Sequence, residues 1–159
     1  MVETPNAGNV AELSGARDAA RKLQAEVVML PAATRADIEA AFRGIAQARL
    51  GALCVLTAPP LFEHLALIAD LAANQRLPSI AAYPRFAEVG GLMSYAADAA
   101  DTQRRLVALA GKILAGARPA LIPTERAQRF SLVLNLKTAR SIGLAMPHSL
   151  MVAADRVIE

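Results

Sequence analysis

The sequence predicts an α/β fold in which a parallel β-sheet is covered by helices. Three observations predict this fold. Short apolar runs of strand length alternate with amphipathic stretches of helix length through the first half of the chain. These runs are continuously apolar, as expected of strands that are covered on both faces of a parallel sheet. The 159 residues are enough for one domain with a sizeable core.

The first half of the chain is expected to form helices and strands in alternation. The expected helices are residues 10–23, the stretch between Thr34 and Gly51, and residues 61–74. The expected strands are residues 26–30, 52–56 and 79–82. Asn9 and Thr34 are the expected N-caps of the first two helices. Because strands and helices of these lengths alternate, we expect parallel βαβ units with right-handed crossovers.

The second half of the chain follows a different pattern. We expect strands at residues 92–95 and 130–136, a long helix at 98–115 and a short helix at 138–142. Asp98 and Asp101 lie at the positive end of the long helix, as the helix dipole favours. The apolar stripe of this helix consists of Leu106, Leu109, Ala110 and Ile113.

Composition excludes some classes of function. The 17 basic and 14 acidic residues are scattered along the chain, and aromatic residues make up 4% with no Trp. A basic patch with stacking aromatics is therefore missing, and we expect no nucleic-acid partner. The single cysteine, Cys54, cannot form an internal disulfide. It lies in the apolar run ALCVL, where we expect it to be buried.

The sequence contains no recognisable catalytic, metal or nucleotide motif. There is no G-x-G-x-x-G or Walker sequence, and no serine stands in a G-x-S-x-G context. His64, His148 and Cys54 are not spaced as a ligand set for a metal ion. We therefore predict a protein that is not an enzyme and needs no cofactor.

The loops at the carboxyl ends of the expected strands are the candidate binding site. Ligands of open parallel sheets bind at that edge. The loops are residues 31–34, 57–60, 82–86 and 95–97, and they carry Tyr83, Phe86 and Tyr95, three of the six aromatic residues in the chain. These aromatics indicate either the mouth of a small-molecule site or side chains that cap the core, and the sequence leaves both interpretations open.

Two long segments carry a resemblance to a known family. They are TAPPLFEHLALIADLAANQRLPSIAAYPRFAEVGGLMSY and FSLVLNLKTARSIGLAMPHSLMVAADRVIE. Together they resemble the C-terminal part of the ABC transporter substrate-binding proteins of the tryptophan/tyrosine type, over nearly the whole chain. The resemblance implies one lobe of a type I-like periplasmic binding protein. It divides the chain into a ligand-binding lobe at 1–89 and a segment at 90–159 that returns toward a second, missing lobe.

The resemblance also implies a site and partners. The ligand loop of the family falls near Thr4 and Asn6, and the other loops of the site contribute Pro59, Tyr83, Phe86 and Tyr95. Pro59 stands where members commonly carry Asp, and Ala96 where they carry Gly. The implied ligand is a small solute such as an aromatic or aliphatic amino acid, and the implied partner is an ABC permease.

Two further expectations follow from the resemblance. Without a second lobe, one side of the solute stays uncovered, so the chain alone should bind weakly, and the stripe at 98–115 needs another partner. We therefore expect a homodimer through residues 98–136, formed by exchange of this segment. The family is periplasmic, whereas MVETPNAGNV lacks the parts of a signal peptide and predicts a cytoplasmic chain as written. The alternative function is a protein-interaction or sensory module that kept the fold.

Overall fold

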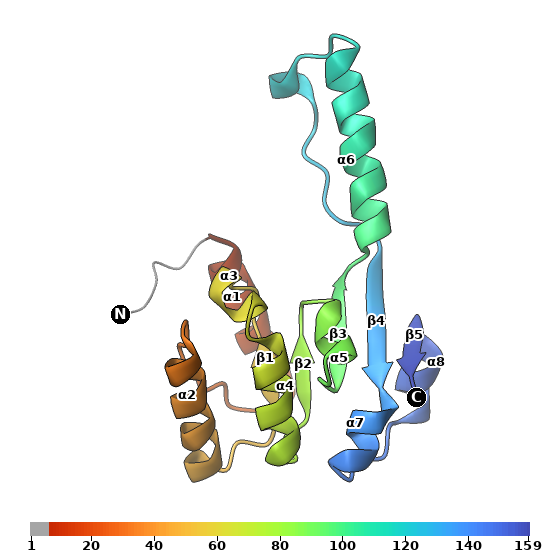
Figure 1. The fold of residues 1–159 in the computed structure, drawn as a ribbon. Helices are drawn as coiled ribbons and strands as arrows, with labels where there is room; N and C mark the ends of the chain where they lie inside the picture. Colours follow the sequence, from red (N-terminus) through yellow and green to blue (C-terminus); the bar gives the residue numbers. More distant parts are fainter. Residues whose placement is uncertain (1–6) are drawn as a thin grey trace.

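The computed structural model describes residues 7–159, and its centre is one five-stranded sheet (Figure 1). The strands are β1 (Leu53–Val55), β2 (Ser79–Ala81), β3 (Met93–Ala97), β4 (Phe130–Asn135) and β5 (Arg156–Ile158), side by side in that order. Every neighbouring pair is parallel except β3 and β4, which are antiparallel. The predicted α/β fold with a mostly parallel sheet is confirmed, and β5 is a strand that the sequence patterns did not reveal.

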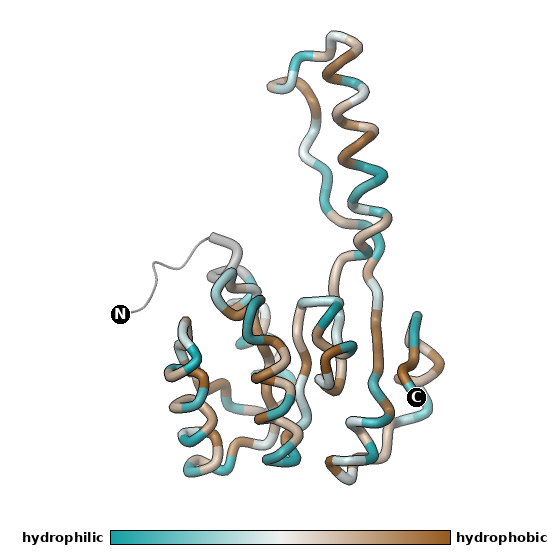
Figure 2. The backbone as a smooth tube through the Cα atoms, in the orientation of Figure 1, coloured by the Kyte–Doolittle hydropathy of each residue, from teal (hydrophilic) through white to brown (hydrophobic). Residues whose placement is uncertain are grey.

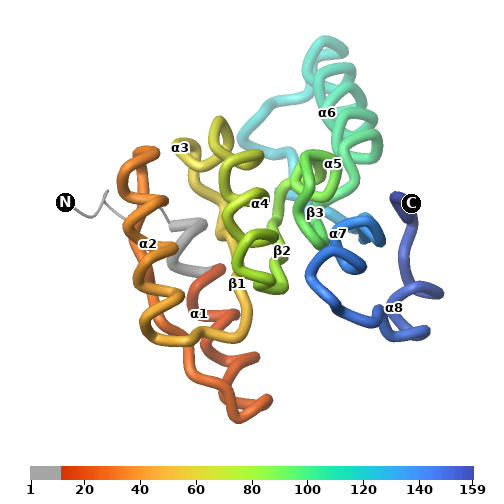
Figure 3. Tube along the Cα trace, turned by 60° about the horizontal axis from the view of Figure 1, so that its bottom comes forward, coloured from red at the N-terminus to blue at the C-terminus, as the bar shows by residue number. Residues whose placement is uncertain are grey.

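Helices lie on both faces of the sheet, apart from α6, which projects away from it (Figure 1). They are α1 (Ala7–Lys22), α2 (Arg35–Ala48), α3 (Pro59–Phe62), α4 (Leu65–Asn74), α5 (Arg85–Glu88), α6 (Ala99–Leu114), α7 (Leu136–Ser141) and α8 (His148–Ala153), with a 3-10 turn at Pro119–Leu121. In Figure 3 the strands separate α1 from α4 and α5. The larger core cluster lies on the α4 side, where the side chains of Val55, Ala81 and Phe86 meet those of α2 and α4.

The second helix forms for the reasons that the sequence indicated. The side chains of Ile38, Phe42 and Ile45 are buried on one face of α2. The Thr34 hydroxyl accepts a hydrogen bond from the Asp37 N–H, and the Asp37 carboxylate accepts one from the Thr34 N–H. This capping box satisfies two backbone donors at the start of the helix and confirms the predicted cap.

Several predicted helix boundaries are wrong. The first helix begins at Ala7, so Asn9 lies inside it and is not the N-cap. The second helix ends at Ala48, because Arg49 adopts a left-handed conformation with φ 53° before Gly51 is reached. The stretch predicted as one helix at 61–74 consists of α3 and α4, separated at Glu63 and His64. Side-chain periodicity continues across such a break and therefore does not reveal it.

Two predictions about strands are also wrong. Residues 26–30 form no strand, since no backbone ladder to a neighbouring segment is found for them in the described part of the chain. A β-branched run becomes a strand only where another backbone supplies hydrogen-bond partners. Cys54 is exposed. It lies in β1 between Leu53 and Val55, which pack with the core, and alternation along a strand turns Cys54 to the opposite face of the sheet.

The long helix α6 and the connector that follows it project from the body as an arm (Figure 1). The arm leaves through the antiparallel pair β3–β4, whose last register pair is Ala97 with Phe130. We define the arm as residues 98–129. Arg105 joins α6 to the connector by donating hydrogen bonds to Glu125 at 2.9 Å and to Gln128 at 2.7 Å, and it also donates to Asp101 within α6 at 2.8 Å.

One face of α6 stays uncovered in the chain. Leu106, Val107 and Leu114 expose 59%, 72% and 89% of their surface, and apolar positions recur along the arm in Figure 2. Leu109 is half-buried, because it lies on the side of the helix that carries Arg105 and faces the connector. The stripe that was predicted to need a partner is therefore covered on one side only.

Candidate functional site

The carboxyl ends of β1, β2 and β3 lie at one edge of the sheet, and the loops that follow them form the candidate site. Two of these loops are tied together by Tyr83. Its hydroxyl donates to the Ala58 carbonyl at 2.8 Å and accepts from the Ala58 N–H at 2.6 Å. The Tyr83 ring also lies against Phe62, with centroids 5.8 Å apart. The loop after β1 is thus fixed to the loop after β2.

A carboxylate from a distant part of the chain also reaches this edge. The Glu12 side chain, on α1, accepts a hydrogen bond from the Thr57 N–H at 2.8 Å and one from the Thr57 hydroxyl at 2.5 Å. We name this contact the Glu12–Thr57 clasp. Sequence reasoning missed Glu12, because 45 residues separate it from Thr57 and no spacing rule connects them.

The charge of Glu12 acts on its neighbours at the site. Burial of the phenol raises the pKa of Tyr83, and the Glu12 carboxylate raises it further. Desolvation of the thiol, followed by the same carboxylate, raises the pKa of Cys54 above its ordinary value. Both groups therefore stay protonated at neutral pH, and the fixed charge beside them is negative.

The structure places the predicted aromatic residues in three different environments. Tyr83 is half-buried at the edge, while Phe86 has no exposed surface and belongs to the core. Tyr95 is half-exposed and stacks on Phe130, with centroids 5.4 Å apart, on the face of the sheet opposite the buried Ser94. The three rings are therefore not gathered around one space, and Phe86 fits the interpretation of an aromatic that caps the core.

The remaining predicted residues are Pro59, Thr4 and Asn6. Pro59 is exposed and is the first residue of α3, a position that suits proline because its missing N–H would have no partner within the helix. Thr4 and Asn6 lie outside the described residues. Their part in the site therefore stays a prediction.

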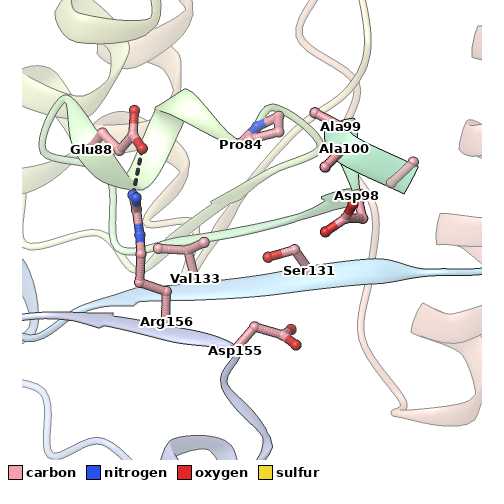
Figure 4. Close-up of a pocket in the computed structure, with 10 residues that line it drawn as sticks. Pro84, Glu88, Asp98, Ala99, Ala100, Ser131, Val133, Asp155 and Arg156 are labelled. Atoms are coloured by element: carbon pink, nitrogen blue, oxygen red, sulfur yellow. Dashed lines mark hydrogen bonds and ion pairs between the residues drawn. The ribbon is translucent and has the colours of Figure 1, made fainter. Parts of the chain in front are cut away.

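A hollow of about 260 Å³ lies where the arm joins the sheet (Figure 4). Its polar lining consists of Glu88, Asp98, Ser131, Asp155 and Arg156. Each charged side chain in it has a partner. Asp98 accepts from the Asp101 N–H at 2.6 Å, Asp155 accepts from the Leu132 N–H at 2.8 Å, and Arg156 pairs with Glu88. Its charged groups are therefore engaged in contacts within the chain.

Metal-ligand clusters and membrane-spanning helices are absent from the described residues. In residues 7–159, no three His, Cys, Asp or Glu side chains are close enough to hold a metal ion. Over the same span, no helix is both long and apolar enough for a membrane crossing. Every buried side-chain nitrogen or oxygen atom in the described part of the chain has a hydrogen-bond partner.

Comparison with solved structures finds the same fold in other proteins. A conserved domain protein from Vibrio cholerae O1 biovar El Tor has 21% identity and a TM-score of 0.84, covering 98% of this chain and 53% of that protein. An ABC domain from Streptococcus pneumonia in complex with L-Trp has 20% identity and a TM-score of 0.85, with coverages of 99% and 54%.

A third structure is the ligand-free, open form of a substrate-binding protein with adhesive properties from Clostridium difficile. It has 19% identity and a TM-score of 0.68, and the match covers 99% of this chain and 52% of that one. The chain therefore spans about half the length of these proteins. No curated protein sequence matches it.

The family assignment comes from the sequence profile described as ABC transporter substrate binding protein. The profile matches residues 3–158, nearly the whole chain. The fold agrees with the solved structures described above, one of which is a complex with L-Trp. The chain belongs to the ABC transporter substrate-binding protein family.

Proposed function

We propose that this chain is a solute-binding component of an ABC-type importer, working outside the cytoplasm with a membrane permease. The family carries this proposal. We further propose an amino acid or a similar small organic molecule as the solute, since a structure of the same fold is a complex with L-Trp. The protein has no catalytic role in this proposal, because binding and release are all that delivery of a solute requires.

The proposed site is the strand-end edge of the sheet. Pro59, Tyr83 and Tyr95 are the proposed contacts in the described part, and Thr4 and Asn6 are the proposed contacts from the first residues. Phe86 would support Tyr83 from the core, because it is wholly buried. With this chain alone, a solute on the edge would be covered on one side.

A second lobe would cover the solute from the other side. The uncovered face of α6 is a suitable seat for that lobe, because Leu106, Val107 and Leu114 are exposed there. Solved proteins of this fold are about twice as long as the chain. A hinge at the β3–β4 ribbon would let the two lobes close on the solute.

Titration of the ¹⁵N-labelled chain with L-tryptophan and L-leucine, followed by amide NMR shifts, tests the proposed site. We expect weak binding with shifts confined to residues 4–6, 57–60, 82–86 and 95–97. The variant Tyr83→Phe should reduce these shifts, since it loses the hydroxyl that ties the two loops. A matched control is Thr102→Val, which also removes one hydroxyl, but from a hydrogen bond to Asp98 on α6, away from the edge. Shifts spread elsewhere, or none at saturating solute, would contradict the site.

We also propose that the chain alone forms a homodimer through residues 98–136. Contiguous exposed apolar patches are uncommon on monomers, and Leu106, Val107 and Leu114 are all exposed on α6. Sedimentation at rising concentration should show a dimer that the substitution Leu106→Glu disperses. Ala108→Glu, on the side of α6 away from the uncovered face, is the matched control and should leave the dimer intact. A wild-type monomer at high concentration would refute this proposal.

A second candidate function is a protein-interaction or sensory module. The observation that favours it is the state of the edge, where the Tyr83 hydroxyl is engaged with Ala58 and Phe86 is buried. The DNA around the coding region separates the two functions. An in-frame upstream lobe with an export signal and a neighbouring permease gene support transport, and their absence supports the module.

A further inference from the structure

Thr57 offers two hydrogen-bond donors to one carboxylate at the strand-end edge. Its N–H and its hydroxyl bind separate oxygens of Glu12, at 2.8 and 2.5 Å. Short hydrogen bonds to an ionised acceptor are strong, and two of them fix the orientation of the carboxylate. Thr57, which follows β1 and Leu56, therefore forms a carboxylate-binding site. This site is already filled by the side chain of Glu12.

The other residues of the loop after β1 offer no free hydrogen-bond donor that could bind a carboxylate in place of Thr57. The Ala58 N–H is taken by the Tyr83 hydroxyl at 2.6 Å, and Pro59 and Pro60 have no N–H. A carboxylate that arrives at the end of β1 must therefore use the two donors of Thr57 and displace Glu12, since a second negative charge beside Glu12 would be repelled.

The helix that carries Glu12 is weakly attached to the body. None of the described side chains of α1, residues 12–22, is buried, and none belongs to the core clusters. The link from α1 to α2, residues 23–34, contains no helix or strand. Segments with few buried contacts open at low cost. Breaking the clasp can therefore release α1 without disturbing the sheet.

We propose that the Glu12–Thr57 clasp is an autoinhibitory contact, in which Glu12 occupies the carboxylate site of the edge until a solute carboxylate replaces it and α1 moves away. This inference rests on the proposed function, because it takes the edge as the place where the solute binds. It assigns Thr57 as the group that recognises the solute carboxylate and Glu12 as its internal competitor.

The test uses sodium acetate as the simplest carboxylate probe on the ¹⁵N-labelled full chain at constant ionic strength. The Thr57 amide shift reports occupancy of the site, and hydrogen exchange of residues 14–22 reports release of α1. Glu12→Ala should bind acetate at least about tenfold more tightly than wild type, because a charged competitor is removed. Thr57→Val should lose most of the response, because one donor is gone.

The matched control is Asp18→Ala, which removes one negative charge from the same helix. Asp18 pairs with Arg21 and has no contact with Thr57. The Asp18→Ala variant should therefore bind acetate with the affinity of wild type. In wild type, saturating acetate should speed hydrogen exchange in residues 14–22 to the rate seen in Glu12→Ala. Equal acetate affinity in wild type and Glu12→Ala, or a silent Thr57 amide in that variant, overturns the inference.

Failure of the inference and failure of the proposed function give different results. If L-tryptophan binds along the edge without shifting the Thr57 amide, the function stands and the clasp is only a tether for α1. If acetate binds at Thr57 but no amino acid binds, the carboxylate site stands and the proposed solute class is wrong.

Discussion

Substituting Gly91 with alanine should destabilise the fold through one steric conflict. An ideal Cβ at Gly91 would overlap three atoms of the Phe86 ring, and even the farthest of them, Cζ, would be 2.7 Å away, against 3.4–4 Å for an ordinary contact. Phe86 has no exposed surface, so its ring has no free space to move into. The φ angle of Gly91 lies outside the left-handed region, and the cost is therefore steric alone.

The expected loss is about 1–3 kcal/mol in the free energy of unfolding, the usual cost of overpacking a core. Urea unfolding should show a lower midpoint with an unchanged m-value. Gly111→Ala is the matched control, since nothing lies within 4 Å of its Cβ on α6. It should be neutral or stabilise the chain by up to about 1 kcal/mol, as glycine disfavours helices.

A double variant tests whether the Phe86 ring is the cause. In a Phe86→Leu background the side chain is smaller, so adding the methyl group at Gly91 should cost less than in wild type. The reasoning is refuted if Gly91→Ala changes stability by less than about 0.5 kcal/mol, the range of a neutral surface substitution. It is also refuted if the cost is the same in both backgrounds.

Three other predictions concern the supports of the fold. Asn135→Ala should lower the free energy of unfolding by about 1–3 kcal/mol in urea titration, because the buried Ala87 carbonyl loses its donor. Hydrogen bonds from the Thr34 side chain, and then from the Thr34 backbone, hold the pKa of the Asp37 carboxyl below its ordinary value. The Asp37 carboxylate therefore stabilises the fold at neutral pH, and this stabilisation is lost as the pH falls through the folded-state pKa. Melting curves of wild type and Asp37→Asn should therefore converge in acid, and divergence there contradicts the sign. Arg105→Ala should speed hydrogen exchange in residues 117–129, and unchanged exchange would show that the connector does not depend on this side chain.

Features that depend on neighbours in sequence could be predicted. The capping box at Thr34 needs residues three apart, and the buried face of α2 needs a period of 3.6 residues. The alternation of apolar and polar residues similarly predicted a strand at 130–136, and the observed strand β4 ends one residue earlier, at Asn135. These signals are local, and the resemblance to binding proteins added the fold type that they could not supply.

Features that depend on distant partners could not be predicted. Residues 26–30 have the composition of a strand but no ladder, and β5 is a strand because β4 pairs with it. The exposure of Cys54 depends on which face of β1 is covered. In the site, the Tyr83 hydroxyl and the Glu12 carboxylate find partners 25 and 45 residues away. No periodicity or spacing rule reports such contacts.

The arm shows a locally predictable feature and an unpredictable long-range contact in the same helix. Periodicity predicted that Leu106, Leu109 and Ile113 share an apolar face, but it could not say what covers them. In the structure Arg105 fixes the connector against one side of α6, which shelters Leu109 and leaves Leu106 59% exposed. The same ionic contacts thus decide which face of the helix is offered outward. Of the four stripe residues only Leu109 is half-buried, and Leu106, Ala110 and Ile113 stay exposed. The contacts of Arg105 therefore decide which part of the stripe is left free for the partner surface proposed above.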